Sequence, residues 1–321
     1  MINRRQCLQM LAVSAVAPGI AQAAWPDKPL RVVVPYAAGG FTDILARILA
    51  TGMAEKLGQP VIVDNRPGAS TMLGADAVAK SPADGHTLLM ATTSTLSTNP
   101  LMFRKMPFKV SDFRPVALTG LTPFVLVAHP SVPAQDAAAL VAHARKNPGK
   151  LNFAMLGSGS STHLMDEMFR RMAGVDIPDV PYKGAGPASN DLLAGHIQLN
   201  FDAVATAIPR IQGGKLKALG ISSDTRSPLL PSVPTFKESG LPEMVAYSWY
   251  GLLAPAGTPT AVVDRLNAVV NQLLNSAEIK ERLLANGATA PQLSAAQFGT
   301  LIDDHTRHWE RIVKPMNLQL D

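Results

Sequence analysis

Two short loops rich in glycine and hydroxyl side chains are the parts of this sequence best suited to binding a small ligand. PYAAGGFTD, at 35–43, follows the apolar run RVVV, and GSGSSTH, at 157–163, follows LNFAML. Each loop leads into a helix-like segment, so its amides lie at a helix N-terminus, where N–H groups without intrahelical acceptors attract a small anion. The sequence therefore predicts two strand–turn–helix units that bind an anion.

The first loop contains no Arg, Lys, His or Cys. Its two glycines allow a sharp turn and remove side chains, so that a ligand can approach the amides, although they also suit a simple strand-to-helix connection. We expect Thr42 to cap the following helix, with Asp43 in its first turn. Apolar residues at helical spacing should then face a sheet, and Gly58 should end the helix; they are Ile44, Leu45, Ile48, Leu49 and Met53.

The second loop offers four hydroxyl groups and two glycines without a charged partner. His163 lies in the first helical turn, where the helix dipole disfavours its protonated form, and it either holds the loop or touches a ligand. Gly174 is the expected end of the helix. Neither Gly157-x-Gly159 nor Gly184-x-Gly186 has the third glycine of a dinucleotide fingerprint, and no Walker sequence is present.

Two enzyme hypotheses come from the same region and from the C-terminal segment. A Ser-dependent hydrolase would use Ser160 with His163, but Gly-x-Ser-x-Gly is absent, and a serine and histidine three residues apart at one helix start rarely reach catalytic geometry. In HTRH, His305 and His308 stand one helical turn apart, as in a zinc site, but spacing fixes no third ligand. We therefore assign no catalytic residue and no metal ligand.

The N-terminus has the layout of an export signal. Residues 1–23 join a basic start to a short apolar stretch that ends in Ala-Gln-Ala, and Arg4-Arg5 leaves both the Sec and the twin-arginine route open. The only cysteine, Cys7, lies in this segment. The mature chain should thus have no disulfide, which a chain of this size does not need for stability.

Charge and length narrow the class of protein further. Of 29 basic residues two lie in the signal, so 27 face 24 acidic ones, and they form no basic stripe; with few aromatic residues, this argues against nucleic acid. Length suggests about two domains. Strand-like and helix-like runs alternate along most of the chain, which predicts an α/β fold.

Several longer motifs occur in order along essentially the whole mature chain. They are WPDKPLRVVVPYAAGGFTDILAR, VIVDNRPGASTMLGADAVAKSPADGHTLLMA, VPYKGAGPASNDLLAGHIQLNFD and SWYGLLAPAGTP. Together they resemble the extracytoplasmic solute receptors of the tripartite tricarboxylate transporter family, also called Bug proteins.

The resemblance implies an α/β, two-lobed, type II-like periplasmic binding protein that closes on its ligand like a flytrap. The chain would cross between lobes near 124–125 and 248–249, giving lobe one as 24–124 plus 249–321 and lobe two as 125–248. The C-terminal helices would pack on lobe one. The resemblance also implies a monomer without cofactor in the periplasm, a small carboxylate ligand, and membrane permease subunits as partners, with a sensory role as the alternative to uptake.

The ligand positions of the family carry over residue by residue. Lys183 is either a cation for a ligand carboxylate or a surface residue, and Asp202 either accepts from a ligand or anchors its loop. Trp249 and Tyr250 are expected to pack at the return crossing. Phe41 stands where the family often has a small residue, so we expect it to narrow the pocket or stack on a flat acid. The expected ligand-binding residues are Tyr36, Ala37, Gly39, Gly40, Phe41, Thr42, Asp43, Thr92, Ser94, Leu156, Gly157, Ser158, Gly159, Ser160, Ser161, His163, Tyr182, Lys183, Gly184 and Asp202.

Overall fold

A computed structural model describes residues 25–156, 159–182, 185–316 and 320. The predicted signal, 1–23, and four of the expected ligand-binding residues, Gly157, Ser158, Lys183 and Gly184, lie outside the described residues. Among the described helices, none is long and apolar enough to cross a membrane.

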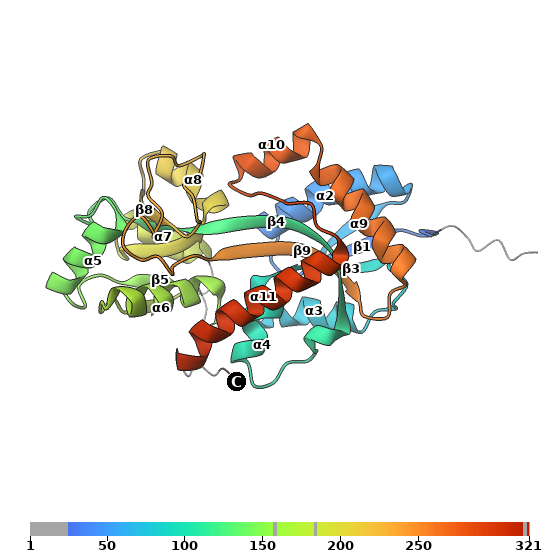
Figure 1. Ribbon diagram of the computed structural model, residues 1–321, viewed down its shortest axis with the longest axis horizontal. Coiled ribbons are helices and arrows are strands. Elements are labelled where there is room, and N and C mark those ends of the chain that lie inside the picture. Colours follow the sequence, from blue (N-terminus) through green and yellow to red (C-terminus); the bar gives the residue numbers. More distant parts are fainter. Residues whose placement is uncertain (1–24, 157–158, 183–184, 317–319, 321) are drawn as a thin grey trace, which may run out of the picture.

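One continuous sheet runs through two lobes (Figure 1). We call the part around β1–β3 the first lobe and the part around β5–β8 the second lobe. The strand order is β2-β1-β3-β9-β4-β7-β5-β6, with β8 also paired to β4. The strands are β1 (Leu30–Val34), β2 (Val61–Asn65), β3 (Thr87–Thr92), β4 (Phe113–Ala128), β5 (Phe153–Met155), β6 (Asp179–Pro181), β7 (Leu199–Ala203), β8 (Lys217–Ile221) and β9 (Tyr247–Pro255).

Helices cover both faces of the sheet in each lobe, which gives the α/β fold that the sequence predicts. The first-lobe elements include α2 (Phe41–Leu57), η1 (Ala69–Thr71), α3 (Met72–Ala79), η2 (Ser94–Thr98), α4 (Asn99–Met102), η3 (Val110–Asp112), α9 (Thr260–Leu274) and α10 (Ala277–Ala285). The second lobe contains α5 (Ala137–Lys146), α6 (Ser161–Ala173), α7 (Ala185–Ala194) and α8 (Val204–Gln212). The chain continues through α11 (Ala295–Val313) and η4 (Lys314–Met316).

The alternation of side chains along β1 explains the two layers of the first lobe. Val32 and Val34 pack with α2 and α9, whereas Val33 packs with α3 and α11. On α2 the buried stripe consists of Leu45, Leu49 and Met53, but Ile44 is exposed, so its expected place against the sheet was wrong. Gly58 ends the helix in the left-handed conformation, as predicted.

Strand β4 connects the lobes because it changes partner along its length. From Phe113 to Pro123 it pairs with β9, and from Phe124 onward it pairs with β7, with β8 alongside from Val125. Strand β9 pairs on its other side with β3 and so returns the chain to the first lobe. The exact lobe boundaries, 24–124 plus 249–321 and 125–248, stay a prediction.

Helix α11 corrects the expectation that all C-terminal helices pack on lobe one. Its first half does so, since Phe298 lies edge-on to Trp249 at 5.5 Å. Its second half buries Trp309 and Val313 in the second-lobe core, together with Phe153 and Phe169. The apolar stripe of α11 is long enough to serve both cores, and the helix thus spans the two lobes (Figure 1).

Candidate ligand-binding site

The first glycine loop connects β1 to α2, and the buried carboxylate of Asp43 accepts a hydrogen bond from it. Gly39 has φ 89° and donates its N–H to Asp43 Oδ2 at 2.9 Å. The helix begins at Phe41, after an extended Gly40, and Thr42 is buried in the first turn, so Thr42 is not the cap. The first amides of α2 have no intrahelical acceptor and remain the anion-attracting feature of this loop.

Asp43 is bonded on both oxygens by the protein itself. Asn65 Nδ2 donates to Oδ1 at 3.0 Å, Arg47 Nε donates to Oδ2 at 3.1 Å, and Arg47 also forms an ion pair of 3.0 Å with Oδ1. Burial alone would raise the pKa of Asp43, but these hydrogen bonds outweigh it and lower the pKa. Asp43 therefore acts as a hydrogen-bond acceptor that shapes the loop.

Three of the expected residues from different first-lobe segments meet beside this loop. Tyr36 Oη and Thr92 Oγ1 are 2.7 Å apart, and Thr92 ends β3 just before Ser94 begins η2. Burial raises the pKa of Tyr36, while hydrogen bonds with Thr92, Ser94 and Thr95 lower it to a smaller extent. These hydroxyls give the first lobe a neutral donor and acceptor cluster.

Phe41 belongs to the core of the first lobe more than to an open pocket. Its side chain is only 8% exposed, and its ring stands edge-on to Tyr250 at 5.0 Å. The ring thus supports Tyr250, and the two roles expected from sequence, narrowing the pocket or stacking on a flat acid, stay predictions.

The second loop has the same layout as the first. Gly159 has φ 84° and donates its N–H to His163 Nδ1 at 3.1 Å. Ser160 caps α6 by accepting from the backbone N–H of His163 at 3.2 Å, and its hydroxyl lies 3.0 Å from Thr162 Oγ1. Leu156 is half-buried before the loop and Ser161 is buried after it. Gly174 ends the helix in the left-handed conformation, as predicted.

His163 holds this loop and does not activate Ser160. Its Nδ1 is taken by Gly159, and Nε2 lies 3.7 Å from Asp179 Oδ2. Burial lowers the pKa of His163, against the raising effect of Asp179 and Glu167. Since the hydroxyl of Ser160 meets the backbone of His163 and not its imidazole, these two residues do not form the nucleophile–base pair that the hydrolase hypothesis needs.

Among the described residues, one cluster has three side chains of the types that bind metal ions, and the guanidinium of Arg170 lies against it. His163, Glu167 and Asp179 place donor atoms within 4.8 Å of one another. Arg170 pairs with Asp179 at 2.8 Å and also bonds Glu167, so its guanidinium lies between the two carboxylates that a metal would need. His305 and His308 form no such group within the described chain, and burial lowers the pKa of His305 to about 4.

Tyr182 and Asp202 are each bonded within the second lobe. Tyr182 donates its hydroxyl to Asp191 Oδ2 at 2.8 Å. Asp202, at the end of β7, accepts from Thr206 Oγ1 and lies 3.6 Å from Arg210 Nη1. Burial raises the pKa of Asp202 even so. Of the two roles left open for Asp202, these contacts favour anchoring.

Tyr250 lies beside the first loop and was expected only to pack at the crossing. It pairs in the sheet with Thr92 and carries Phe41 on its ring. Burial raises the pKa of Tyr250 strongly, and the negative charges that Tyr36 and Asp202 can carry raise it further. The sequence signal was its place in SWYG, where the chain returns to the first lobe. Trp249, in contrast, is fully buried and donates from Nε1 to Ser97 at 3.3 Å, which is a packing role.

The profile of the tripartite tricarboxylate transporter family receptor matches residues 45–318. The chain belongs to this receptor family. BugT of Bordetella pertussis is 37% identical over 312 residues, which cover 97% of this chain and 96% of BugT. The family resemblance drawn from the motifs is thus confirmed, and family receptors of this kind are periplasmic solute-binding proteins.

Solved structures of relatives confirm the two-lobed fold of the receptor. Rpa4515 of R. palustris, solved with adipate, has a TM-score of 0.85 and 35% identity, covering 90% of this chain and 97% of its own. MatC of Rhodopseudomonas palustris, solved with bound malate, has a TM-score of 0.82 and 35% identity, covering 90% of this chain and 100% of its own.

Proposed function

We propose that this protein is a periplasmic receptor that captures a small organic carboxylate between its lobes for uptake by a tripartite tricarboxylate transporter. The observation that carries the proposal is the pair of glycine loops, one in each lobe, that lead into the N-termini of α2 and α6. Family membership supports it, and two relatives of similar structure hold the dicarboxylates adipate and malate.

In this proposal, one ligand carboxylate lies against the free amides of the first turns of α2 and α6. Neutral donors suit the task because they accept a carboxylate without a fixed counter-charge, directly or through ordered water. The hydroxyls of Tyr36, Thr92 and Ser160 would add further contacts, with Ser94, Ser161 and the remaining loop residues around them. Asp43 and His163 stand behind the two loops and set their shape.

The mechanism we propose is closure by bridging. A ligand that touches both loops favours the closed arrangement, because only there does it make all of its contacts. Strands β4 and β9 are the connections between the lobes that would bend. The closed receptor, a monomer exported through its signal segment, would deliver the acid unaltered to the membrane subunits.

A thermal-shift screen of the mature protein tests the ligand class. Succinate, malate, adipate, citrate and benzoate are compared with succinamide and glucose. We expect at least one carboxylate to raise Tm by several degrees, since a ligand at one hundred times its Kd adds about 2.7 kcal/mol to stability. Stabilisation by the amide or the sugar alone would overturn the proposal.

A pair of tyrosine variants locates the site. Tyr36→Phe removes the hydroxyl that meets Thr92, whereas Tyr247→Phe removes an exposed hydroxyl bonded to Asp224. The Tm increase produced by the best carboxylate should shrink in the Tyr36 variant and persist in the Tyr247 variant. Equal shifts in both variants would place the ligand elsewhere.

Recovery of the acid unaltered after incubation with the protein, checked by NMR, separates a receptor from an enzyme.

A further inference from the structure

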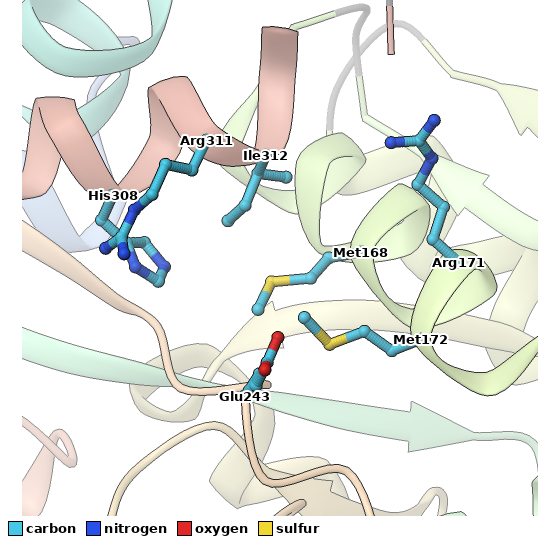
Figure 2. A pocket seen from close by; sticks show the side chains of 7 residues that line it. All are labelled: Met168, Arg171, Met172, Glu243, His308, Arg311 and Ile312. Carbon is cyan, nitrogen blue, oxygen red and sulfur yellow. The ribbon is translucent and has the colours of Figure 1, made fainter. Parts of the chain in front are cut away.

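A second pocket, of about 510 Å³, lies between α6, α11 and the loop before β9 (Figure 2). This volume falls in the range of small-molecule sites. The pocket is at the far end of α6 from the serine loop: Met172 is about 16 Å along the helix axis from Ser161 at 1.5 Å per residue. Its lining residues are Met168, Arg171, Met172, Glu243, His308, Arg311 and Ile312.

The floor of this pocket is apolar and adaptable. Met168 is buried in the second-lobe core, and Met172 and Ile312 are half-buried against the same core. Both methionines extend from α6 toward the centre of the pocket, opposite the α11 side chains (Figure 2). Thioethers fit irregular shapes and make favourable contacts with aromatic rings. The floor therefore suits an apolar or aromatic group.

Two residues of opposite charge, Arg311 and Glu243, stand at the rim of the pocket. Within the described part of the chain, neither Arg311 nor Glu243 makes a hydrogen bond or an ion pair, and both are exposed. Glu243 rises from its loop toward the centre, and Arg311 lies beside His308 on α11 (Figure 2). The remaining arginine, Arg171, points away from the centre and donates to the carbonyl of Pro315 at 2.9 Å.

His308, one of the residues that line the pocket, has a buried polar atom. His308 Nε2 is shielded from solvent and has no hydrogen-bond partner among the described residues. Burial, followed by the charge of Arg311, lowers the pKa of His308, so its ring is neutral and able to accept or donate one hydrogen bond. An unpaired buried nitrogen is costly, and a ligand polar group that reached it would remove that cost.

We propose that this pocket is a second binding site, for a zwitterion with an apolar side chain, that is, an amino acid of the phenylalanine or methionine kind. The carboxylate meets Arg311, the ammonium meets Glu243, and the side chain covers Met168 and Met172. A ligand with a single charge would gain from one rim residue and be repelled by the other, so the two unpaired charges select a molecule that carries both signs.

Methionine-methyl NMR of the full mature protein tests the proposal at the site itself. The protein is labelled with [13C-methyl]methionine, and the Met168 and Met172 signals are assigned from the Met168→Leu and Met172→Leu variants. L-phenylalanine is titrated beside 3-phenylpropionate, which lacks the ammonium, and 2-phenylethylamine, which lacks the carboxylate. We expect the Kd of L-phenylalanine, read from the shifts of both methyl signals, to be at least tenfold lower than the Kd of either singly charged analogue.

Rim variants complete the test with a matched control. Arg311→Gln and Glu243→Gln should each weaken the L-phenylalanine response at least tenfold, whereas Arg171→Gln should leave it unchanged. Equal responses to phenylpropionate, no response of the two methyl groups, or unchanged binding in both rim variants would each overturn the proposal. Binding in the inter-lobe site is distinguished because it would leave the Met168 and Met172 signals in place.

Discussion

Gly39 in the first loop and Gly159 in the second have nearly the same backbone, with φ 89° and 84°, and each donates its N–H to the side chain four residues later. The acceptors differ. Asp43 is a carboxylate that Arg47 and Asn65 also bond, whereas His163 is a neutral imidazole close to Asp179. The comparison teaches that one loop geometry rests on a charged acceptor in the first lobe and on an uncharged one in the second.

Buried carboxylates in the two lobes show why the partners matter. Asp43 has hydrogen bonds on both oxygens and a lowered pKa. Asp166, on α6, is fully buried, and neither of its oxygens has a hydrogen-bond partner among the described residues. Burial raises the pKa of Asp166 well above its ordinary value, and Asp179 raises it further. The contacts of the first lobe thus favour the charged form of Asp43, whereas the surroundings of Asp166 in the second lobe disfavour its charged form.

Removal of the charged acceptor, Asp43, should have the largest effect on the free energy of unfolding. Asp43→Ala removes the acceptor of the Gly39 N–H and leaves the Asn65 amide with the Tyr36 carbonyl alone, and we expect the free energy of unfolding at pH 7 to fall by about 2–3 kcal/mol. Urea denaturation measures it. Asp264→Ala is the matched control, since this exposed residue of α9 has no hydrogen bond or ion pair in the described structure, and it should change stability by less than about 0.5 kcal/mol. Similar losses in the two variants would remove Asp43 from its supporting role.

Adding a methyl group to each glycine compares the surroundings of the loops. A Cβ at Gly39 meets nothing within 4 Å, so Gly39→Ala should cost about 1 kcal/mol from its positive φ alone. A Cβ at Gly159 would meet Met102 Cε and, at 2.8 Å, Leu320 Cδ1. Gly159→Ala should therefore cost about 1 kcal/mol more than Gly39→Ala, because buried side chains must also move. Denaturation of both variants checks the order, and a larger loss at Gly39 would contradict it.

Much of the fold could be predicted because local signals agree with it. The glycines that end α2 and α6, the alternating strands and helices, and the family motifs all lead to a two-lobed α/β receptor. The shared design of the two loops was also readable, since strand, glycine and helix follow one another in both. These features depend on neighbours in sequence, which a single chain displays directly.

The details of the site depend on partners distant in sequence, and these were harder to predict. Asn65 on β2 donates to Asp43, and no motif near either residue predicts this hydrogen bond. Phe41 enters the core because Tyr250, more than 200 residues later, offers its ring. For the same reason α11 was misplaced: its stripe reads as one amphipathic face, and only the assembled lobes show that the face serves two cores.

The smallest expected effect concerns pH and separates the two acceptors most directly. His163 has a lowered pKa in the folded protein, so on acidification below about 6.5, its ordinary value, the unfolded chain takes up the proton first and stability falls. His163→Gln keeps an acceptor for Gly159 but does not titrate. The stability advantage of wild type over this variant should therefore shrink between pH 7.5 and pH 5, in total by no more than about 1.4 kcal/mol for each unit by which burial lowers the pKa of His163.

Subtraction of the two proteins isolates this residue. Asp179, Glu167 and Arg170 are the charged groups that face His163, and they are present in both proteins, as are the buried His305 and His308. The carboxylate of Asp43 stays ionised over this range because its pKa is lowered, so the first loop should keep its acceptor. Urea denaturation at half-unit pH steps gives the difference curve. A difference that does not change with pH would mean that His163 is not the neutral acceptor on which the second loop rests.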